Sequence, residues 1–117
     1  MRFEYRKSEV TLNDESDTLN VSLYGDDGRY VCFMRSWDAE FYEAGPTGLE
    51  IEINSQSGLI TGKVVSSIYV TDDIVRVELR SNNRLGMPSV EVFGVIPLSM
   101  SKIIRLVVEG AVPVEPE

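Results

Sequence analysis

The chain has 117 residues, of which 43% are hydrophobic, so it is long enough for one domain with its own core. Acidic residues outnumber basic ones 19 to 11, and the net charge of −8 disfavours nucleic acid and anionic membranes, which both attract basic patches. A single cysteine excludes an internal disulfide, and the first residues lack the apolar run of a signal peptide, so we expect a cytoplasmic protein.

Two-residue alternation of apolar and polar side chains dominates the chain and predicts strands rather than helices. In chain order, the predicted strands are 2–6, 18–24, 29–35, 49–54, 61–70, 74–80 and 90–95. The predicted fold is therefore mostly β, either a single antiparallel, strongly twisted sheet or a small sandwich of about six to seven strands, with one short C-terminal helix.

Two of the predicted connections are tight turns. Gly-Asp-Asp-Gly at 25–28 predicts a hairpin between the second and third strands, because these residues tolerate the positive φ angles of hairpin loops. Thr-Asp-Asp at 71–73 predicts a second hairpin. The strand at 29–35 is almost continuously apolar, which predicts a central strand covered on both faces and places Cys32 in the core.

The segment 49–54 has the clearest pattern of a half-buried strand. Its three aliphatic residues alternate with Glu50 and Glu52, which we expect on the solvent face. Arg76 and Arg80 point outward from a later strand, and they are placed to pair with these two carboxylates.

The C-terminal part of the domain is predicted to end in a helix. Ser99 or Ser101 is expected to cap a helix that runs through 102–109, although the β-branched residues there also suit a strand. The predicted organisation is a single β-rich domain over 1–110, followed by a flexible tail over 111–117.

Residues that carry chemistry are scarce. The chain has no histidine, and Cys32 alone cannot assemble a zinc site, so we expect no catalytic residue, no metal and no cofactor. Glu50 and Glu52, about 7 Å apart on one strand face, are a carboxylate pair of the kind that sugar-cleaving enzymes use, although most acidic β-proteins contain such a pair. A small carbohydrate-active or sugar-binding protein is therefore an alternative to a non-enzymatic binding protein.

The segment 37–43 interleaves aromatic and acidic side chains, a combination that suits the docking of a basic protein. Its aromatic residues can instead close one end of the core. The candidate partner-binding residues are Trp37, Asp38, Glu40, Tyr42, Glu43, Glu50 and Glu52.

Four stretches of this chain resemble one family of small bacterial proteins. They are Tyr-Val-Cys-Phe-Met-Arg-Ser at 30–36 with the acidic-aromatic segment after it, Leu49–Gly58, Asp73–Leu79, and the stretch from Val90 to Ser99. Over roughly residues 21–108 the chain is similar to the immunity proteins of bacterial polymorphic toxin systems, specifically the immunity protein 10 family. The most diagnostic piece is Glu-Ile-Asn-x-Gln at 52–56, whereas Ser-Met-Ser-Lys at 99–102 departs from the acidic residues usual before the final helix.

This resemblance implies a mostly β, non-enzymatic, cytoplasmic protein that binds a cognate toxin domain and protects the producing cell. Given the net charge of −8, we expect that toxin domain to be basic. The alternative is a homodimer, formed through an exposed sheet edge, that serves as a structural or accessory protein.

Overall fold

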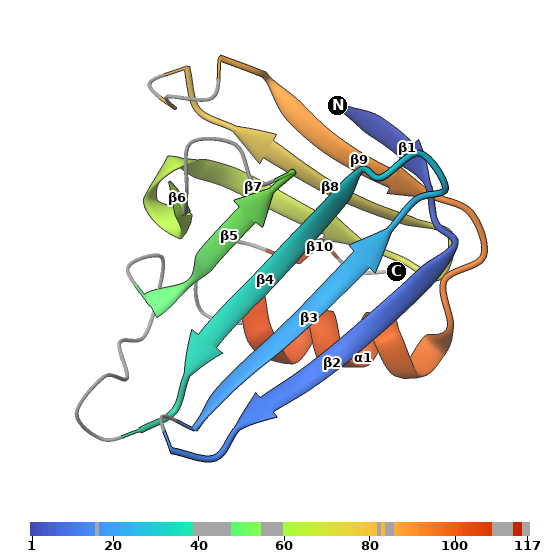
Figure 1. Ribbon diagram of the computed structural model, residues 1–117. Helices are drawn as coiled ribbons and strands as arrows, with labels where there is room; N and C mark the ends of the chain where they lie inside the picture. The colour runs from blue at the N-terminus through green and yellow to red at the C-terminus, as the bar shows by residue number, and fades with distance from the viewer. Residues whose placement is uncertain are drawn as a thin grey trace.

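The computed structural model describes residues 1–15, 17–38, 48–54, 60–81, 83, 86–108 and 114–115, and shows two five-stranded sheets and one α-helix (Figure 1). The mostly β fold with one C-terminal helix is thereby confirmed. The elements of the first half are β1 (Arg2–Glu4), β2 (Lys7–Asn13), β3 (Thr18–Tyr24), β4 (Tyr30–Ser36) and β5 (Glu50–Ile53). Those of the second half are β6 (Ile60–Thr61), the 3-10 turn η2 (Gly62–Val64), β7 (Val65–Val70), β8 (Ile74–Leu79), β9 (Ser89–Phe93), α1 (Leu98–Val108) and β10 (Val114–Glu115).

Sheet B is formed by five consecutive strands, whereas sheet A combines the first strand with the last four. Sheet A has the strand order β1-β9-β8-β7-β10, and sheet B has the order β2-β3-β4-β5-β6. All neighbouring strands are antiparallel except β1 with β9 and β10 with β7. The chain crosses between the sheets at Tyr5–Arg6, where the Tyr5 N–H bonds to Phe93 in sheet A and the Arg6 N–H bonds to Tyr24 in sheet B. It crosses again through η2.

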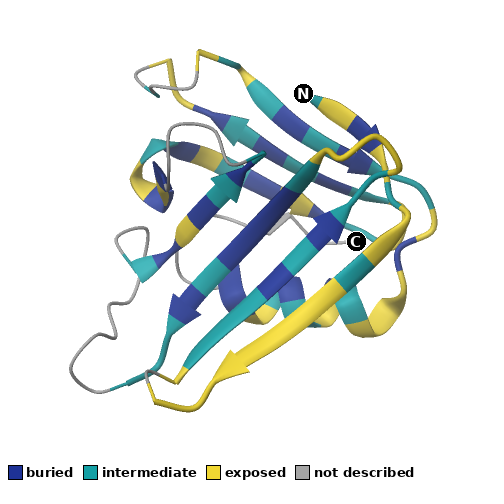
Figure 2. Ribbon diagram, viewed as in Figure 1, coloured by how far each residue is buried: buried dark blue, intermediate teal, exposed yellow. Residues whose placement is uncertain are grey.

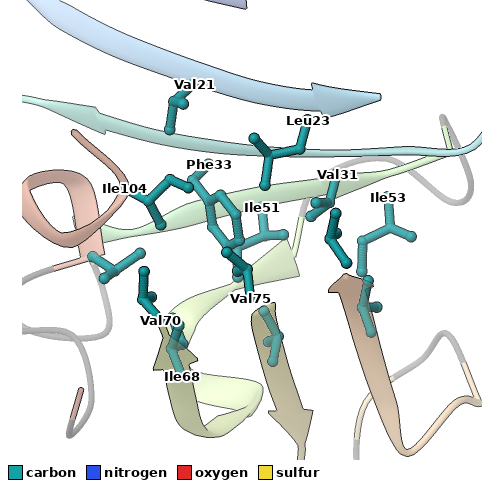
Figure 3. Close-up of a cluster of buried hydrophobic side chains, with 14 of the residues drawn as sticks. Val21, Leu23, Val31, Phe33, Ile51, Ile53, Ile68, Val70, Val75 and Ile104 are labelled. Carbon is teal, nitrogen blue, oxygen red and sulfur yellow. The ribbon is translucent and has the colours of Figure 1, made fainter. Parts of the chain in front are cut away.

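The core lies between the inner faces of the sheets and is built of aliphatic side chains around Phe33 (Figure 3). Phe33 and Ile51 of sheet B point toward Val75 and Ile68 of sheet A, and all four are fully or almost fully buried. Helix α1 packs against β3, β4 and β7 and adds Ile104 to this cluster. Burial of these side chains is the main force that holds the sheets together.

Both predicted hairpins are present. Strands β3 and β4 pair from Thr18↔Ser36 to Tyr24↔Tyr30, and the turn between them has Gly28 at φ 83°, a conformation that favours glycine. Strands β7 and β8 pair across the turn at 71–73. In β5 the aliphatic residues face inward and the two glutamates outward, as predicted.

The described residues form ten strands, more than the six to seven predicted. The predicted strand at 2–6 ends at Glu4, because the chain changes sheet there, and β2 was not predicted. Strand β2 lies at the edge of sheet B, and six of its seven residues are exposed, so its apolar alternation is weak. The predicted strand at 61–70 is divided by η2. Of the predicted tail, Val114–Glu115 pairs with β7, and the remainder lies outside the described residues.

The C-terminal segment is a helix and not a strand, since its buried residues recur at helical spacing: Ser101, Ile104, Val107 and Val108. The predicted serine cap is wrong, because both serines lie inside the helix and the Ser101 hydroxyl donates to the Leu98 carbonyl oxygen. Two arginines attach the helix: Arg35 Nε donates to the Val107 oxygen at 2.7 Å, and Arg105 donates to the Val70 oxygen. Within the described part of the chain, no helix has the length and apolar character needed to cross a membrane.

Candidate functional site

No other described element covers the outer face of sheet B (Figure 2). In each strand of the sheet, every second side chain points to this surface, which we call the B face, and the register places these side chains side by side. Its central members are Lys7, Glu9, Asn20, Ser22, Tyr24, Tyr30, Cys32, Met34, Glu50 and Glu52.

An apolar patch occupies the middle of the B face. The rings of Tyr24 and Tyr30 are 5.7 Å apart and tilted by 38°, and Cys32 and Met34 follow along β4. Strand β4 is central, as predicted, but no described element covers its outer side. Cys32 is correspondingly buried by its neighbours on the B face, and does not belong to the core cluster between the sheets.

Carboxylates surround this patch. Across the sheet, Glu9 pairs with Ser22, Ser22 with Cys32, and Cys32 with Glu52, so one row carries a glutamate at each end. The Tyr30 hydroxyl donates to Glu52 Oε1 at 3.1 Å. Burial raises the pKa of the Cys32 thiol, a hydrogen bond with Ser22 opposes this effect, and the charges of Glu52 and Glu9 raise the pKa further.

The charges of these carboxylates are not neutralised within the sheet. Among the described residues, neither Glu9 nor Glu50 has a basic partner within 4.0 Å, and both are exposed. The cation on this face, Lys7, lies over the Tyr24 ring with its Nζ 5.4 Å from the centroid. The B face therefore presents uncompensated negative charge around an aromatic and sulfur-containing centre.

The outer face of sheet A has the opposite character, because its charges pair with one another. Glu91 accepts from Arg2 Nε at 2.5 Å and lies 3.3 Å from Arg76 Nε, and Arg76 also approaches Glu78 at 3.8 Å. The predicted pairing of Arg76 and Arg80 with the glutamates of β5 is thus wrong, since β5 and β8 belong to different sheets. Arg80 Nε donates instead to the Lys63 carbonyl oxygen.

The seven predicted partner-binding residues do not form one cluster. Glu50 and Glu52 lie together on the B face. The Trp37 side chain packs against the core and therefore does not lie on the B face. Its backbone N–H donates to the backbone oxygen of Asp17 at 2.9 Å. The Asp38 N–H bonds to Ser36 Oγ at 3.2 Å, just beyond the end of β4. The other three, Glu40, Tyr42 and Glu43, lie outside the described residues.

Sequence reasoning missed Glu9, Tyr24, Tyr30 and Met34 as members of the site. Tyr24 had a usable signal, because it has the parity of the polar positions in a cleanly alternating strand. Tyr30 and Met34 had none, because in a continuously apolar strand the pattern does not distinguish the inner side from the outer side.

A hollow of about 350 Å³ lies where β1 and β9 meet the β3–β4 turn. It is lined by Arg2, Phe3, Glu4, Arg6, Asp26, Asp27 and Phe93. Arg6 pairs with Asp26 and Glu4, at 2.7 and 3.0 Å, so much of its charge is compensated.

In the described part of the chain, no three histidine, cysteine or acidic side chains come together as metal ligands would. No protein-family model, curated protein or solved structure matches the chain.

Proposed function

We propose that the protein is a non-enzymatic inhibitor that docks the B face on a basic protein, and that this partner is a cognate bacterial toxin domain. The observation that carries the proposal is the contrast between the two sheets. Sheet A pairs its outward charges internally, whereas Glu9 and Glu50 on the B face have no basic partner among the described residues. Unpaired carboxylates of this kind contribute little to folding, and they favour a partner that supplies the missing cations. The resemblance to immunity proteins supports the choice of a toxin domain.

We infer that the carboxylates and the apolar side chains of the B face have different roles in binding. Glu9, Glu50 and Glu52 attract a basic surface over a distance of about 8–10 Å at physiological salt, and so increase the rate of productive encounter. Tyr30 and Met34 provide the apolar contact area that excludes water, and so slow dissociation. If the toxin is a nuclease, the three carboxylates occupy positions that substrate phosphates would otherwise take.

The test begins with the partner itself. The tagged protein is used to capture its ligand from the producing cell in moderate salt, and the recovered domain is identified by mass spectrometry and purified. Association rates are then measured against salt concentration for the wild type and for a Glu50→Lys/Glu52→Lys variant. The matched control is Asp72→Lys/Glu78→Lys, which makes the same change in net charge away from the B face.

We expect the B-face variant to associate at least tenfold more slowly at low salt and to lose most of the salt dependence of the rate. The control should lose much less, because its reversed charges lie away from the interface. Equal effects of the two variants would show that only net charge matters and would reject the B face as the docking site. Recovery of no partner except the protein itself would reject toxin neutralisation.

A further inference from the structure

In the described part of the chain, no strand pairs with the outer edge of β2, so this edge of sheet B is free. Strand β2 is the terminal strand of the sheet order and pairs with β3 in unbroken register over Lys7–Asn13, without a proline or a bulge (Figure 1). Natural edge strands are usually shortened, bulged or covered, because their free N–H and C=O groups bind other strands. On the inner side of the sheet, where α1 packs against β3 and β4, Val10 and Leu12 remain 40% and 55% exposed. This edge therefore offers both backbone hydrogen bonds and apolar surface.

The charges along this strand are asymmetric. Arg6 and Lys7 stand at its start, and Asp14 and Glu15 follow its end; all four are exposed. Asp14 and Glu15 have no basic partner among the described residues. Asp14 and Glu15 make one end of the free edge acidic, and Arg6 and Lys7 make the other end basic, with Arg6 also paired to Asp26 and Glu4 of its own chain. An antiparallel copy of the same segment would place each basic end beside an acidic end.

We propose that two copies of this chain pair through β2, antiparallel and about a two-fold axis at Val10. This register uses the whole strand: Val10 meets Val10 of the second copy, Leu12 lies opposite Ser8, and Arg6 lies opposite Asp14. No two like charges are directly opposed, and the exposed apolar residues cover one another. The two B sheets become one sheet with both B faces on the same side, because the two-fold axis is perpendicular to the sheet.

A second copy suits this edge better than an unrelated strand, because the strand is its own complement. A partner strand would need apolar residues on the inner side and opposite charges at both ends, and β2 itself supplies all of these in one register. The inference is independent of toxin binding, since the edge of β2 and the B face are different surfaces.

The experiment is sedimentation equilibrium of the full chain from about 1 μM to 1 mM at physiological salt. We expect the apparent mass to rise with concentration from 13.1 kDa toward twice that value. In Val10→Lys the two new ammonium groups would face each other across the axis, and the dimer should be lost. The matched control is Leu106→Lys, an exposed apolar residue on α1, which should leave the dimer unchanged.

A charge-exchange cycle separates this interface from general effects on folding. Arg6→Glu and Asp14→Arg should each weaken the dimer roughly three- to tenfold, because the Arg6–Asp14 pair occurs twice in a symmetric interface, and the double variant should recover most of the loss. Arg6, Val10 and Asp14 are all exposed, so we expect these variants to retain the fold. A chain that stays monomeric up to 1 mM would overturn the proposal, as would a dimer that Val10→Lys leaves intact or single variants that the double variant does not rescue.

Discussion

The Nε atom of Arg35 donates a 2.7 Å hydrogen bond to the carbonyl oxygen of Val107, in the last turn of α1. Only 2% of Arg35 is exposed, and it projects from the inner side of β4. Carbonyl groups in the last turn of a helix have no partner within the helix and carry partial negative charge, so a buried guanidinium satisfies both needs. This hydrogen bond connects the helix to sheet B, and the hydrogen bond from Arg105 to the Val70 oxygen connects it to sheet A.

We therefore expect Arg35→Met to lower the free energy of unfolding by about 2–3 kcal/mol, because a charge-assisted hydrogen bond is lost and a buried carbonyl is left without a donor. Urea denaturation followed by circular dichroism measures this change. Arg80→Met is the matched control, since Arg80 also donates from Nε to a backbone oxygen but is exposed, and it should cost less than about 1 kcal/mol. Equal losses in the two variants would contradict the role given to burial.

The helix should also contribute through its buried side. Ile104 is fully buried against both sheets, whereas Leu106 is 50% exposed. Ile104→Ala should cost about 2–5 kcal/mol, because it leaves a cavity in the core, and Leu106→Ala should cost less than about 1 kcal/mol. Both variants have the same helix-favouring residue, so thermal and urea unfolding compare packing alone. If Ile104→Ala proved as mild as Leu106→Ala, the helix would not be part of the core.

The contrast between the two outer faces predicts opposite effects on stability. Glu91→Gln removes the ion pairs with Arg2 and Arg76 and should lower the free energy of unfolding by about 0.5–1 kcal/mol at low salt. Glu50→Gln should leave stability unchanged or raise it slightly, because it removes an unpaired charge about 7 Å from Glu52. The two isosteric variants are compared by urea titration in low and high salt. A loss in Glu50→Gln as large as that in Glu91→Gln would mean that Glu50 has a structural partner.

Cys32 should be unreactive in the folded protein, because burial raises its pKa above the ordinary value of 9.0 and thiolate is the reactive form. We expect a thiol reagent at pH 8 to label it at least about tenfold more slowly than in 6 M urea. A thiol whose pKa is raised by folding stabilises the protein fully below pH 9, and this contribution is lost as the pH rises toward the folded-state value. Cys32→Ala should therefore show a smaller alkaline loss of stability than the wild type. Rapid labelling of the folded protein would show that the B face opens readily at Cys32.

Local patterns in the sequence predicted the strands whose two faces differ in polarity. Strand β5 is the best example, because Ile51 and Ile53 could only face a core and Glu50 and Glu52 only solvent. Strand β4 was located correctly, but its outer side was assigned to the core, since Cys32 and Met34 are no more polar than Phe33. An apolar residue on the solvent side of a central strand is shielded by its neighbours, and alternation cannot reveal this.

The order in which strands pair was beyond local reasoning. Arg76 alternates outward just as predicted, yet its acidic partner is Glu91 and not a glutamate of β5, because strand order depends on pairings far apart in the chain. Glu9 was missed because β2 is an edge strand with six exposed residues. Neither face of β2 is clearly apolar, so the sequence pattern did not predict a strand there.

The parallel pairing of β1 with β9, in which Phe3 lies beside Val92, has a consequence for how the protein is made on the ribosome. The hairpins β3–β4 and β7–β8 can close as soon as each emerges, because their strands are neighbours in the chain. Strand β1 is translated before all of them, yet its place in sheet A does not exist until β9 has been synthesised. Of the strands described here, β1 is therefore translated first but is among the last to pair, so we expect Phe3 to remain without its neighbour Val92 until β9 has been made.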